Sequence, residues 1–299
     1  MSGVVEVENL HKAYGQTLAL NGFAMSVEPG EVHGFLGPNG AGKTTTIRIL
    51  LGLIRADSGR VSVLGGEPWT DAVDIHRRLA YVPGDVALWP NITGGEVIDL
   101  LGRLRGGLDP KRTASFIDLF DLDPTKKGRA YSKGNRQKVA LVAALASHAE
   151  LLILDEPTAG LDPLMEAEFR TQVKAIQGEG RTVLLASHIL GEVEALCDKV
   201  SIIRDGINVE TGSISEMRKL SRLYVDARVD DAAGAAKLGQ VEGVSGLTVN
   251  DHSIQCEVDP AALSELLNQL APLGVQHLES RTSTLEELFL RHYESGSRS

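Results

Sequence analysis

Residues 37–45 read Gly37-Pro38-Asn39-Gly40-Ala41-Gly42-Lys43-Thr44-Thr45, which fits the phosphate-binding pattern G-x-x-x-x-G-K-[ST], the P-loop. Its three glycines let the backbone wrap closely around an anion, Lys43 can reach the outer phosphates, and the Thr44 hydroxyl can ligate Mg²⁺. Residues 32–36 read as a short buried strand, and residues 45–51 as a helix whose N-terminus faces the phosphates. A glycine-rich turn with a stray lysine would lack these flanks, so we expect residues 37–45 to bind a nucleoside triphosphate.

Length and charge restrict the class of protein. The chain has 299 residues, of which 42% are hydrophobic, which suggests about two domains with their own cores. Thirty Lys and Arg residues against forty Asp and Glu residues give a formal net charge of -10. This balance disfavours a phosphate backbone as the main ligand, so we expect no nucleic-acid partner.

The apolar segments bear on location. Residues 1–6 lack a basic region followed by an apolar core, so we expect no secretory signal and a protein that stays inside the cell. The longest apolar tract, residues 139–154, is interrupted by polar residues and is too short to span a bilayer. Any membrane role should therefore come through a partner. Cys197 and Cys256 lack metal-ligand spacing and read as buried thiols.

Strand-like and helix-like segments alternate, which predicts an α/β fold with helices on the faces of a sheet. Residues 4–7 and 60–64 look like edge strands of a small antiparallel sheet. Residues 151–154 and 182–186 lack polar alternation and suit central strands buried on both faces. Between residues 86 and 149 the pattern becomes helical, so we expect a helical insert in the nucleotide-binding domain. The apolar residues expected on one face of its first helix are Val97, Leu100, Leu101 and Leu104.

Two acids follow the central strand at residues 151–154. Carboxylates at the carboxyl edge of an α/β sheet lie where ligands bind. Asp155 can hold Mg²⁺ through water, and Glu156 can act as the general base that polarises an attacking water. A helix cap or a solvated pair is the plainer reading, but beside a P-loop the acids indicate hydrolysis. His188 follows the next strand and could touch the γ-phosphate, although a lone histidine is more often structural.

A second anion site is indicated at Ser132. This residue can cap a helix that continues through residues 137–141, which leaves a hydroxyl and free N–H groups at a positive helix end. Because the chain has one P-loop, a second phosphate site suggests two chains that clasp one nucleoside triphosphate between them. An ordinary capped helix is the simpler interpretation. Asp162 followed by Pro163 is likewise a good start for the next helix.

Taken in order, these segments resemble the ATP-binding cassette ATPases over roughly residues 4–215. Residues 131–137, Tyr131-Ser132-Lys133-Gly134-Asn135-Arg136-Gln137, resemble the signature motif of that family, and Ala159-Gly160-Leu161-Asp162 resembles its D-loop. The resemblance implies that Tyr14 stacks on adenine and that His188 is the switch histidine.

The resemblance further implies ATP and Mg²⁺ as ligands and a head-to-tail pair of cassettes with two ATP molecules in the interface. The second cassette is most simply an identical chain. The implied catalytic residues are Lys43, Glu156 and His188, and the implied metal ligands are Thr44 and Asp155. The residues implied to act on the ATP of the other subunit are Ser132 and Gly134, with Asp162 touching that subunit.

Two positions depart from the family pattern. Where the family has a glutamine that contacts Mg²⁺ and water and links the site to the membrane partner, this chain has Gly84 followed by Asp85. We expect Asp85 or a water to fill the gap, with coupling altered more than chemistry. Lys133 replaces a signature glycine, and a cation beside a γ-phosphate is tolerable because its stem can point to solvent.

Residues 216–299 read as a separate small domain. The order β-α-β-β-α-β suggests a ferredoxin-like unit, with a hairpin around Asn250-Asp251. Residues 283–289 begin with a capping box and form one apolar stripe, which is most simply a packing helix. This ending also resembles the tail of ATPase subunits from bacterial drug and antibiotic exporters.

We therefore expect residues 1–215 to form the nucleotide-binding domain of an ATPase subunit that drives a separate polytopic permease. The protein would lie at the cytoplasmic face of the membrane and export drugs, antibiotics or other hydrophobic compounds. One alternative is a soluble cassette ATPase that remodels a cytosolic complex. Another is a nucleotide-gated scaffold with little hydrolysis, which Gly84 makes conceivable.

Overall fold

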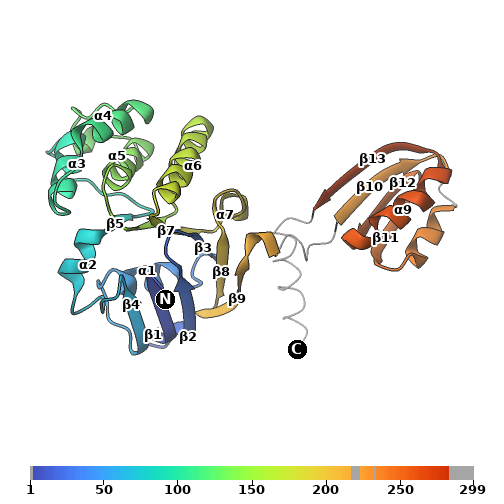
Figure 1. The fold of residues 1–299 in the computed structure, drawn as a ribbon, viewed down its shortest axis with the longest axis horizontal. Helices are drawn as coiled ribbons and strands as arrows, with labels where there is room; N and C mark the ends of the chain where they lie inside the picture. Colours follow the sequence, from blue (N-terminus) through green and yellow to red (C-terminus); the bar gives the residue numbers. More distant parts are fainter. Residues whose placement is uncertain (1–2, 217–222, 232–233, 283–299) are drawn as a thin grey trace. The chain divides into compact units, whose positions relative to one another are not determined.

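The computed structural model describes residues 3–216, 223–231 and 234–282. The chain divides into two compact units, Met1–Ser213 and Ile214–Ser299, so the division falls two residues before the end of the predicted nucleotide-binding domain. In the part of the chain that the structure describes, the first unit contains two sheets and the second unit contains one (Figure 1). Each unit has its own hydrophobic core.

A six-stranded sheet forms the centre of the first unit. Its strands, in spatial order, are β5 (Leu79–Val82), β6 (Leu151–Asp155), β7 (Thr182–Ser187), β3 (Val32–Leu36), β8 (Lys199–Arg204) and β9 (Ile207–Ser213). All neighbours pair in parallel except β8 and β9. Every residue of β3, β6 and β7 is buried, which confirms the prediction of central strands. Their carboxyl ends therefore meet at one edge of the sheet.

A three-stranded antiparallel sheet accompanies it, in the order β2 (Thr17–Val27), β1 (Val5–Tyr14), β4 (Ser58–Val63). The expectation that residues 4–7 form an edge strand was wrong, because β1 lies in the middle with partners on both sides. Alternation reports which face of a strand is buried and not how many neighbours it has. The sequence analysis also did not predict β2, which pairs antiparallel with the other edge of β1.

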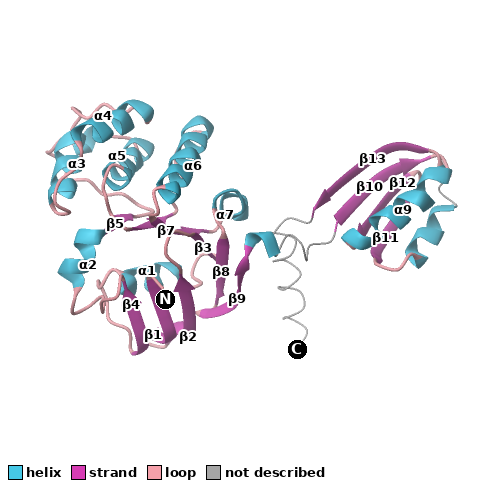
Figure 2. Ribbon diagram, in the orientation of Figure 1, coloured by secondary structure: helices cyan, strands magenta, loops and turns pink. Residues whose placement is uncertain are grey.

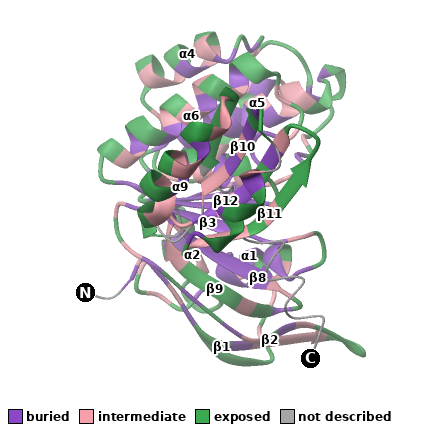
Figure 3. Cartoon of the chain, turned by 90° about the vertical axis from the view of Figure 1, so that its right-hand side faces the viewer, coloured by how far each residue is buried: buried purple, intermediate pink, exposed green. Residues whose placement is uncertain are grey.

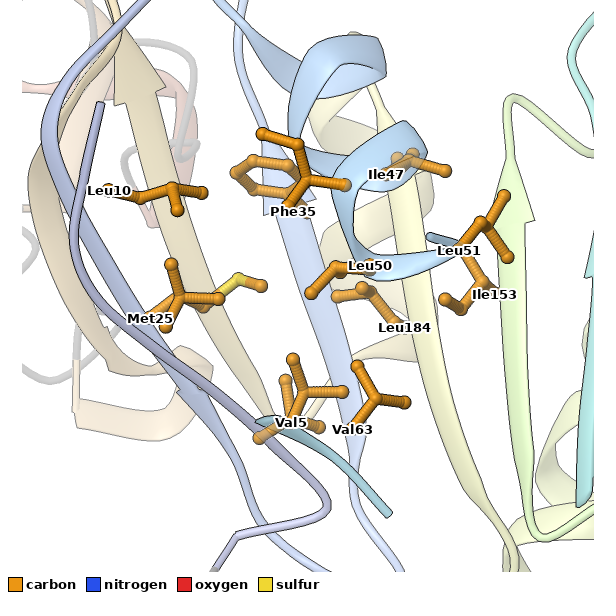
Figure 4. Close-up of a cluster of buried hydrophobic side chains, with 14 of the residues drawn as sticks. Val5, Leu10, Met25, Phe35, Ile47, Leu50, Leu51, Val63, Ile153 and Leu184 are labelled. Carbon is orange, nitrogen blue, oxygen red and sulfur yellow. The ribbon is translucent and has the colours of Figure 1, made fainter. Parts of the chain in front are cut away.

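A single apolar cluster joins the two sheets (Figure 4). Phe35 of β3 lies 5.5 Å from Phe23 of β2, centroid to centroid. Helix α1 (Lys43–Leu50) adds Ile47 and Leu50, both fully buried. The helix that follows the P-loop is therefore anchored in the core.

The helical insert gathers over one end of the sheet, as Figure 2 shows. It contains α3 (Gly94–Arg103), α4 (Pro110–Leu119), the short η1 (Gly128–Ala130) and α5 (Lys133–Leu145). The remaining helices of the unit are α2 (Ala72–Arg78), α6 (Pro163–Gly178) and α7 (Leu190–Leu196). Residues 139–145 of α5 are all buried, because α5 packs on α3, α4 and β5.

The predicted apolar face of α3 is only partly packed. Val97 is buried, but Leu100 and Leu104 are 40% and 65% exposed. Ile98 and Gly102 are buried instead, so the packed face is rotated towards them. Gly102 sits against Leu108, since a Cβ added there would lie 2.4 Å from that side chain. Close packing at a glycine leaves no hydrophobic signal in the sequence, which is why the predicted face was wrong.

The second unit holds a four-stranded antiparallel sheet in the order β11 (Val244–Asn250), β12 (Ser253–Val258), β10 (Leu223–Val229), β13 (Val275–Thr282). Its helical segments are η2 (Gly234–Gln240), η3 (Pro260–Ala262), α9 (Leu263–Leu270) and η4 (Ala271–Leu273). This is the predicted ferredoxin-like order, with a 3₁₀ segment as the first helix. The predicted hairpin is present, with Asn250 paired to Ser253. The capping box at residues 283–289 lies outside the described residues.

Helices such as α6 carry both buried and exposed residues (Figure 3), whereas every residue of β3, β6 and β7 is buried. In the second unit, Leu238, Leu266 and Leu270 from the helical segments pack with Val225 and Ile254 from the sheet. Both cysteines are free and buried, as predicted. Burial raises the pKa of the Cys256 thiol to about 11 and that of Cys197 further, so neither thiol is a reactive nucleophile. Among the described residues, no helix has both the length and the apolar character needed to cross a bilayer.

Phe35→Ala should destabilise the protein by about 3–5 kcal/mol, because it leaves a cavity where the two sheets meet. The free energy of unfolding of the full chain, measured by chemical denaturation, tests this. Trp89→Ala, which changes a 56% exposed ring, is the control and should have a small effect. Equal losses in the two variants would contradict the role of Phe35.

Candidate nucleotide site

The P-loop connects the buried strand β3 to α1, as the sequence predicts. Gly42 precedes α1 with φ 114°, a conformation that side chains rarely adopt. At Gly37 the constraint is space, because an added Cβ would lie 2.4 Å from the Ile203 carbonyl oxygen of β8. The two glycines therefore allow a tight turn that brings successive backbone N–H groups to the start of the helix.

Lys43 is buried and folded back over its own loop. Its Nζ donates to the carbonyl oxygens of Gly37 at 2.5 Å and Pro38 at 3.1 Å. Burial lowers the pKa of Lys43, and the charges of Glu156 and Asp155 oppose that shift. The ammonium thus lies within the electrostatic reach of both acids, at the position predicted for the outer phosphates.

Asp155 ends β6 and is nearly buried. Desolvation, and then the neighbouring charge of Glu156, raise the pKa of Asp155 to about 6, while Lys43 and Arg48 act in the opposite direction. A desolvated carboxylate beside a second carboxylate favours the binding of a hard cation, because such cations prefer oxygen ligands. Thr44 offers an exposed hydroxyl at the start of α1.

The donor set fits Mg²⁺ only as part of a larger complex. Among the described residues there is no group of three or more His, Cys, Asp or Glu side chains that could hold a metal by itself. A site built from Thr44 and Asp155 needs further oxygens from water and from phosphates, which is the usual manner of binding Mg²⁺ with a nucleotide.

Glu156 and His188 contact each other directly. His188 Nδ1 and Glu156 Oε1 are 2.9 Å apart, and both side chains are partly exposed. The Glu156 N–H donates to the Ala186 carbonyl at 2.9 Å, which ties the end of β6 to β7. Glu156 has φ 47°, in the left-handed region that non-glycine residues seldom adopt. The structure therefore brings the two residues together at the sheet edge, a contact that the sequence did not specify.

The signature segment and the D-loop lie against each other. Ser132 accepts from the Asn135 N–H at 3.2 Å, and Asp162 accepts from the Met165 N–H at 3.0 Å, so both predicted helix caps are confirmed. An added Cβ at Gly134 would lie 2.4 Å from the Gly160 carbonyl oxygen. The glycine at position 134 is therefore required for the close approach of these two segments.

Other predicted site residues lie apart from this group. Tyr14 is exposed at the end of β1, with the Lys12 ammonium 5.7 Å from its ring centroid. Within residues 3–216, no hydrogen bond or ion pair joins Tyr14 or Ser132 to the acids at the sheet edge.

Gly84 lies against the site, since an added Cβ would be 3.3 Å from the Asp155 carbonyl oxygen. Asp85 is exposed, and its substitute role stays a prediction.

Comparison with known proteins decides the family. A family model described as "ABC transporter" matches residues 20–159. The bacitracin transport ATP-binding protein BcrA of Enterococcus faecalis is 31% identical, over 97% of this chain and 96% of the relative. The chain belongs to the ABC transporter family. The daunorubicin resistance ATP-binding protein DrrA3 of Streptomyces coeruleorubidus is 35% identical, with 96% and 94% covered. A solved ATP-binding subunit of an ABC transporter matches with a TM-score of 0.67 at 29% identity, over 72% of this chain and 92% of that chain.

This ABC protein is thus an ATP-binding and ATP-hydrolysing subunit, and the resemblance drawn from its motifs is confirmed. Two buried polar residues of its site were not assigned a role from the sequence. Gln137 Nε2 donates to the carbonyl oxygens of Pro83 at 3.4 Å and Pro157 at 3.2 Å, which links the helical insert to the turn after Glu156. Glu192 accepts two hydroxyl hydrogen bonds. In the sequence, the only sign that Gln137 or Glu192 is buried is its position next to apolar residues of a helix.

Asp155→Asn should raise the midpoint of thermal unfolding of this ABC protein by several degrees at pH 8 in a chelator. The pKa of Asp155 rises from 3.8 to about 6 on folding, so the fold favours the protonated form. Stability linked to that form is lost as the pH rises through about 6, and asparagine avoids the loss. The gain should shrink towards pH 5, whereas Mg²⁺-dependent turnover should fall at least 10²-fold.

The exposed variant Asp85→Asn is the control for a simple change of charge. A thermal shift for Asp155→Asn that is the same at pH 5 and pH 8 would show that the charge of Asp155 is not its cause.

Proposed function

We propose that this ATPase drives a separate membrane permease that exports antibiotics or other drug-like compounds. The hydrolytic part of the proposal rests on the contact between Glu156 and His188. This pair lies at the same sheet edge as Asp155, and Lys43 is within electrostatic reach of both acids. Similarity over nearly the whole chain to ATP-binding proteins named for bacitracin transport and daunorubicin resistance supports the class of compound.

In the proposed reaction, Lys43 exchanges its loop carbonyls for the outer phosphate oxygens of ATP, and the N–H groups of residues 37–45 surround those phosphates. Mg²⁺ held by Thr44 and Asp155 would neutralise phosphate charge. Glu156 accepts a proton from the attacking water as general base, and His188 orients the Glu156 carboxylate through their hydrogen bond. Tyr14 provides an exposed ring for stacking on adenine.

The working unit in this proposal is a head-to-tail pair of identical chains. Ser132 is exposed at the positive end of α5, where a hydroxyl and N–H groups can bind phosphate. The contact between Gly134 and Gly160 holds the signature segment beside the D-loop, so that both can face one partner. Asp162 begins α6 at the end of that D-loop. A P-loop from one chain and these segments from the other would enclose each ATP.

The permease would hold the protein at the cytoplasmic face of the membrane. A groove of about 420 Å³ between α2 and the end of α3 supports this partner. The residues that line it are Ala72, Val73, His76, Arg77, Leu104 and Arg105. Val73 and Leu104 are 69% and 65% exposed, so the groove offers apolar surface that the first unit does not use in its own packing.

Glu156→Gln should reduce ATP turnover by roughly 10² or more while preserving ATP binding, because the amide cannot accept the proton of the attacking water. Steady-state phosphate release and a nucleotide-binding titration measure the two effects. Turnover near that of the wild type in this variant would remove Glu156 from the role of base. A wild type that binds ATP without Mg²⁺-dependent turnover would instead support the scaffold alternative.

Leu104→Glu should reduce co-purification with a polytopic membrane protein from detergent-solubilised native membranes by about tenfold. It places a charge in the apolar groove without changing the ATP site. Leu53→Glu is the matched control, since Leu53 is also exposed but lies outside the groove. Equal recovery of the membrane protein with both variants would contradict docking at the groove. Absence of any membrane protein with the wild type would favour the soluble alternative.

A further inference from the structure

A buried carboxylate lies behind the catalytic pair. Glu192 is on α7 and is only 6% exposed. The Thr158 hydroxyl donates to its Oε1, and the Ser187 hydroxyl donates to its Oε2 at 2.7 Å. A carboxylate in this position needs such donors, because burying it without partners costs several kcal/mol. Both oxygens of Glu192 are therefore engaged with defined residues.

The two hydroxyls come from the segments that carry the catalytic pair. Thr158 follows Glu156 by two residues, and Ser187 directly precedes His188. Ser187 Oγ also accepts from the Ile189 N–H at 2.9 Å. Because a serine has a single hydroxyl proton, its donation to Glu192 leaves the lone pairs free for Ile189. Glu192 thus fixes the orientation of the hydroxyl that shapes the turn around His188.

Glu156 and His188 have little packing of their own to hold them. Their side chains are 31% and 45% exposed, yet the Oε1–Nδ1 distance is 2.9 Å. The backbone bond from Glu156 to Ala186 aligns the strand ends but does not set the turns that follow them. Those turns are joined through Glu192.

We propose that Glu192 is a positioning residue that sets the geometry of Glu156 and His188 by holding Thr158 and Ser187 together. This inference rests on the proposed role of Glu156 as general base. Glu192 does not reach the reacting atoms itself, since its oxygens are taken up by the two hydroxyls. Its loss should therefore act on the chemical step and not on the binding of ATP, which Lys43 and the P-loop perform on another element.

The decisive variant is Glu192→Gln, which keeps the size of the side chain and replaces one of its two acceptor oxygens with an amide donor. We expect kcat for ATP hydrolysis to fall about 10–50-fold, with the Kd for ATP changed less than twofold. Glu194→Gln makes the same change two residues along the same helix and should leave both quantities near wild type. Thr158→Val and Ser187→Ala each break one of the two links and should each lower kcat.

A double-mutant cycle with Glu156→Gln separates positioning from a structural effect. If Glu192 acts through Glu156, Glu192→Gln should cause no further loss in the Glu156→Gln background. A further loss by the same factor would overturn the proposal, as would unchanged kcat in Glu192→Gln. Should Glu192→Gln fail to fold, the Thr158 and Ser187 variants decide in its place by the same cycle. An impaired Glu156→Gln with an unimpaired Glu192→Gln would reject this inference alone, whereas an unimpaired Glu156→Gln would reject the proposed base as well.

Discussion

The register of three parallel strands is the constraint on which the site depends. Leu36 of β3 pairs with Ser187 of β7, and Asp155 of β6 pairs with Ala186 of β7. The three strands therefore end side by side at the same edge of the sheet. The parallel backbone ladders hold this register, and a slip in either one would separate the loops that follow the strands. The P-loop, the two acids and His188 meet for this reason, although long stretches of sequence lie between them.

Much of this could be predicted from the sequence. Residues 151–154 contain no polar alternation, which is a direct sign of burial on both faces. Lys43 belongs to the P-loop pattern, which together with its flanking strand and helix indicates phosphate binding. The helix caps at Ser132 and Asp162 were also readable, since capping depends on residues three positions apart. Signals of this kind are local, so they survive without knowledge of the fold.

What could not be predicted depends on contacts between distant segments. Thr158, which donates to Glu192, is 34 residues away from it in the sequence. No local pattern around either residue predicts this hydrogen bond. The burial of Gly102 against Leu108 and the exposure of Leu104 rotate the packed face of α3 away from the expected one, because packing at a glycine carries no apolar signal. The central place of β1 depends on its pairing with β2 on one side and β4 on the other, which the pattern of β1 alone does not reveal. The roles of Tyr14 and Asp85 also depend on long-range contacts, in these cases with a bound molecule outside the chain.

The position of Lys43 has a consequence for the exchange of nucleotide. Lys43 is nearly buried, and its ammonium already donates to two carbonyl oxygens of its own loop. An arriving triphosphate therefore takes over hydrogen bonds that these carbonyls hold, and a departing one returns them. The loop and the nucleotide compete for the same proton donors, so the affinity for ATP reflects the difference between two sets of oxygens.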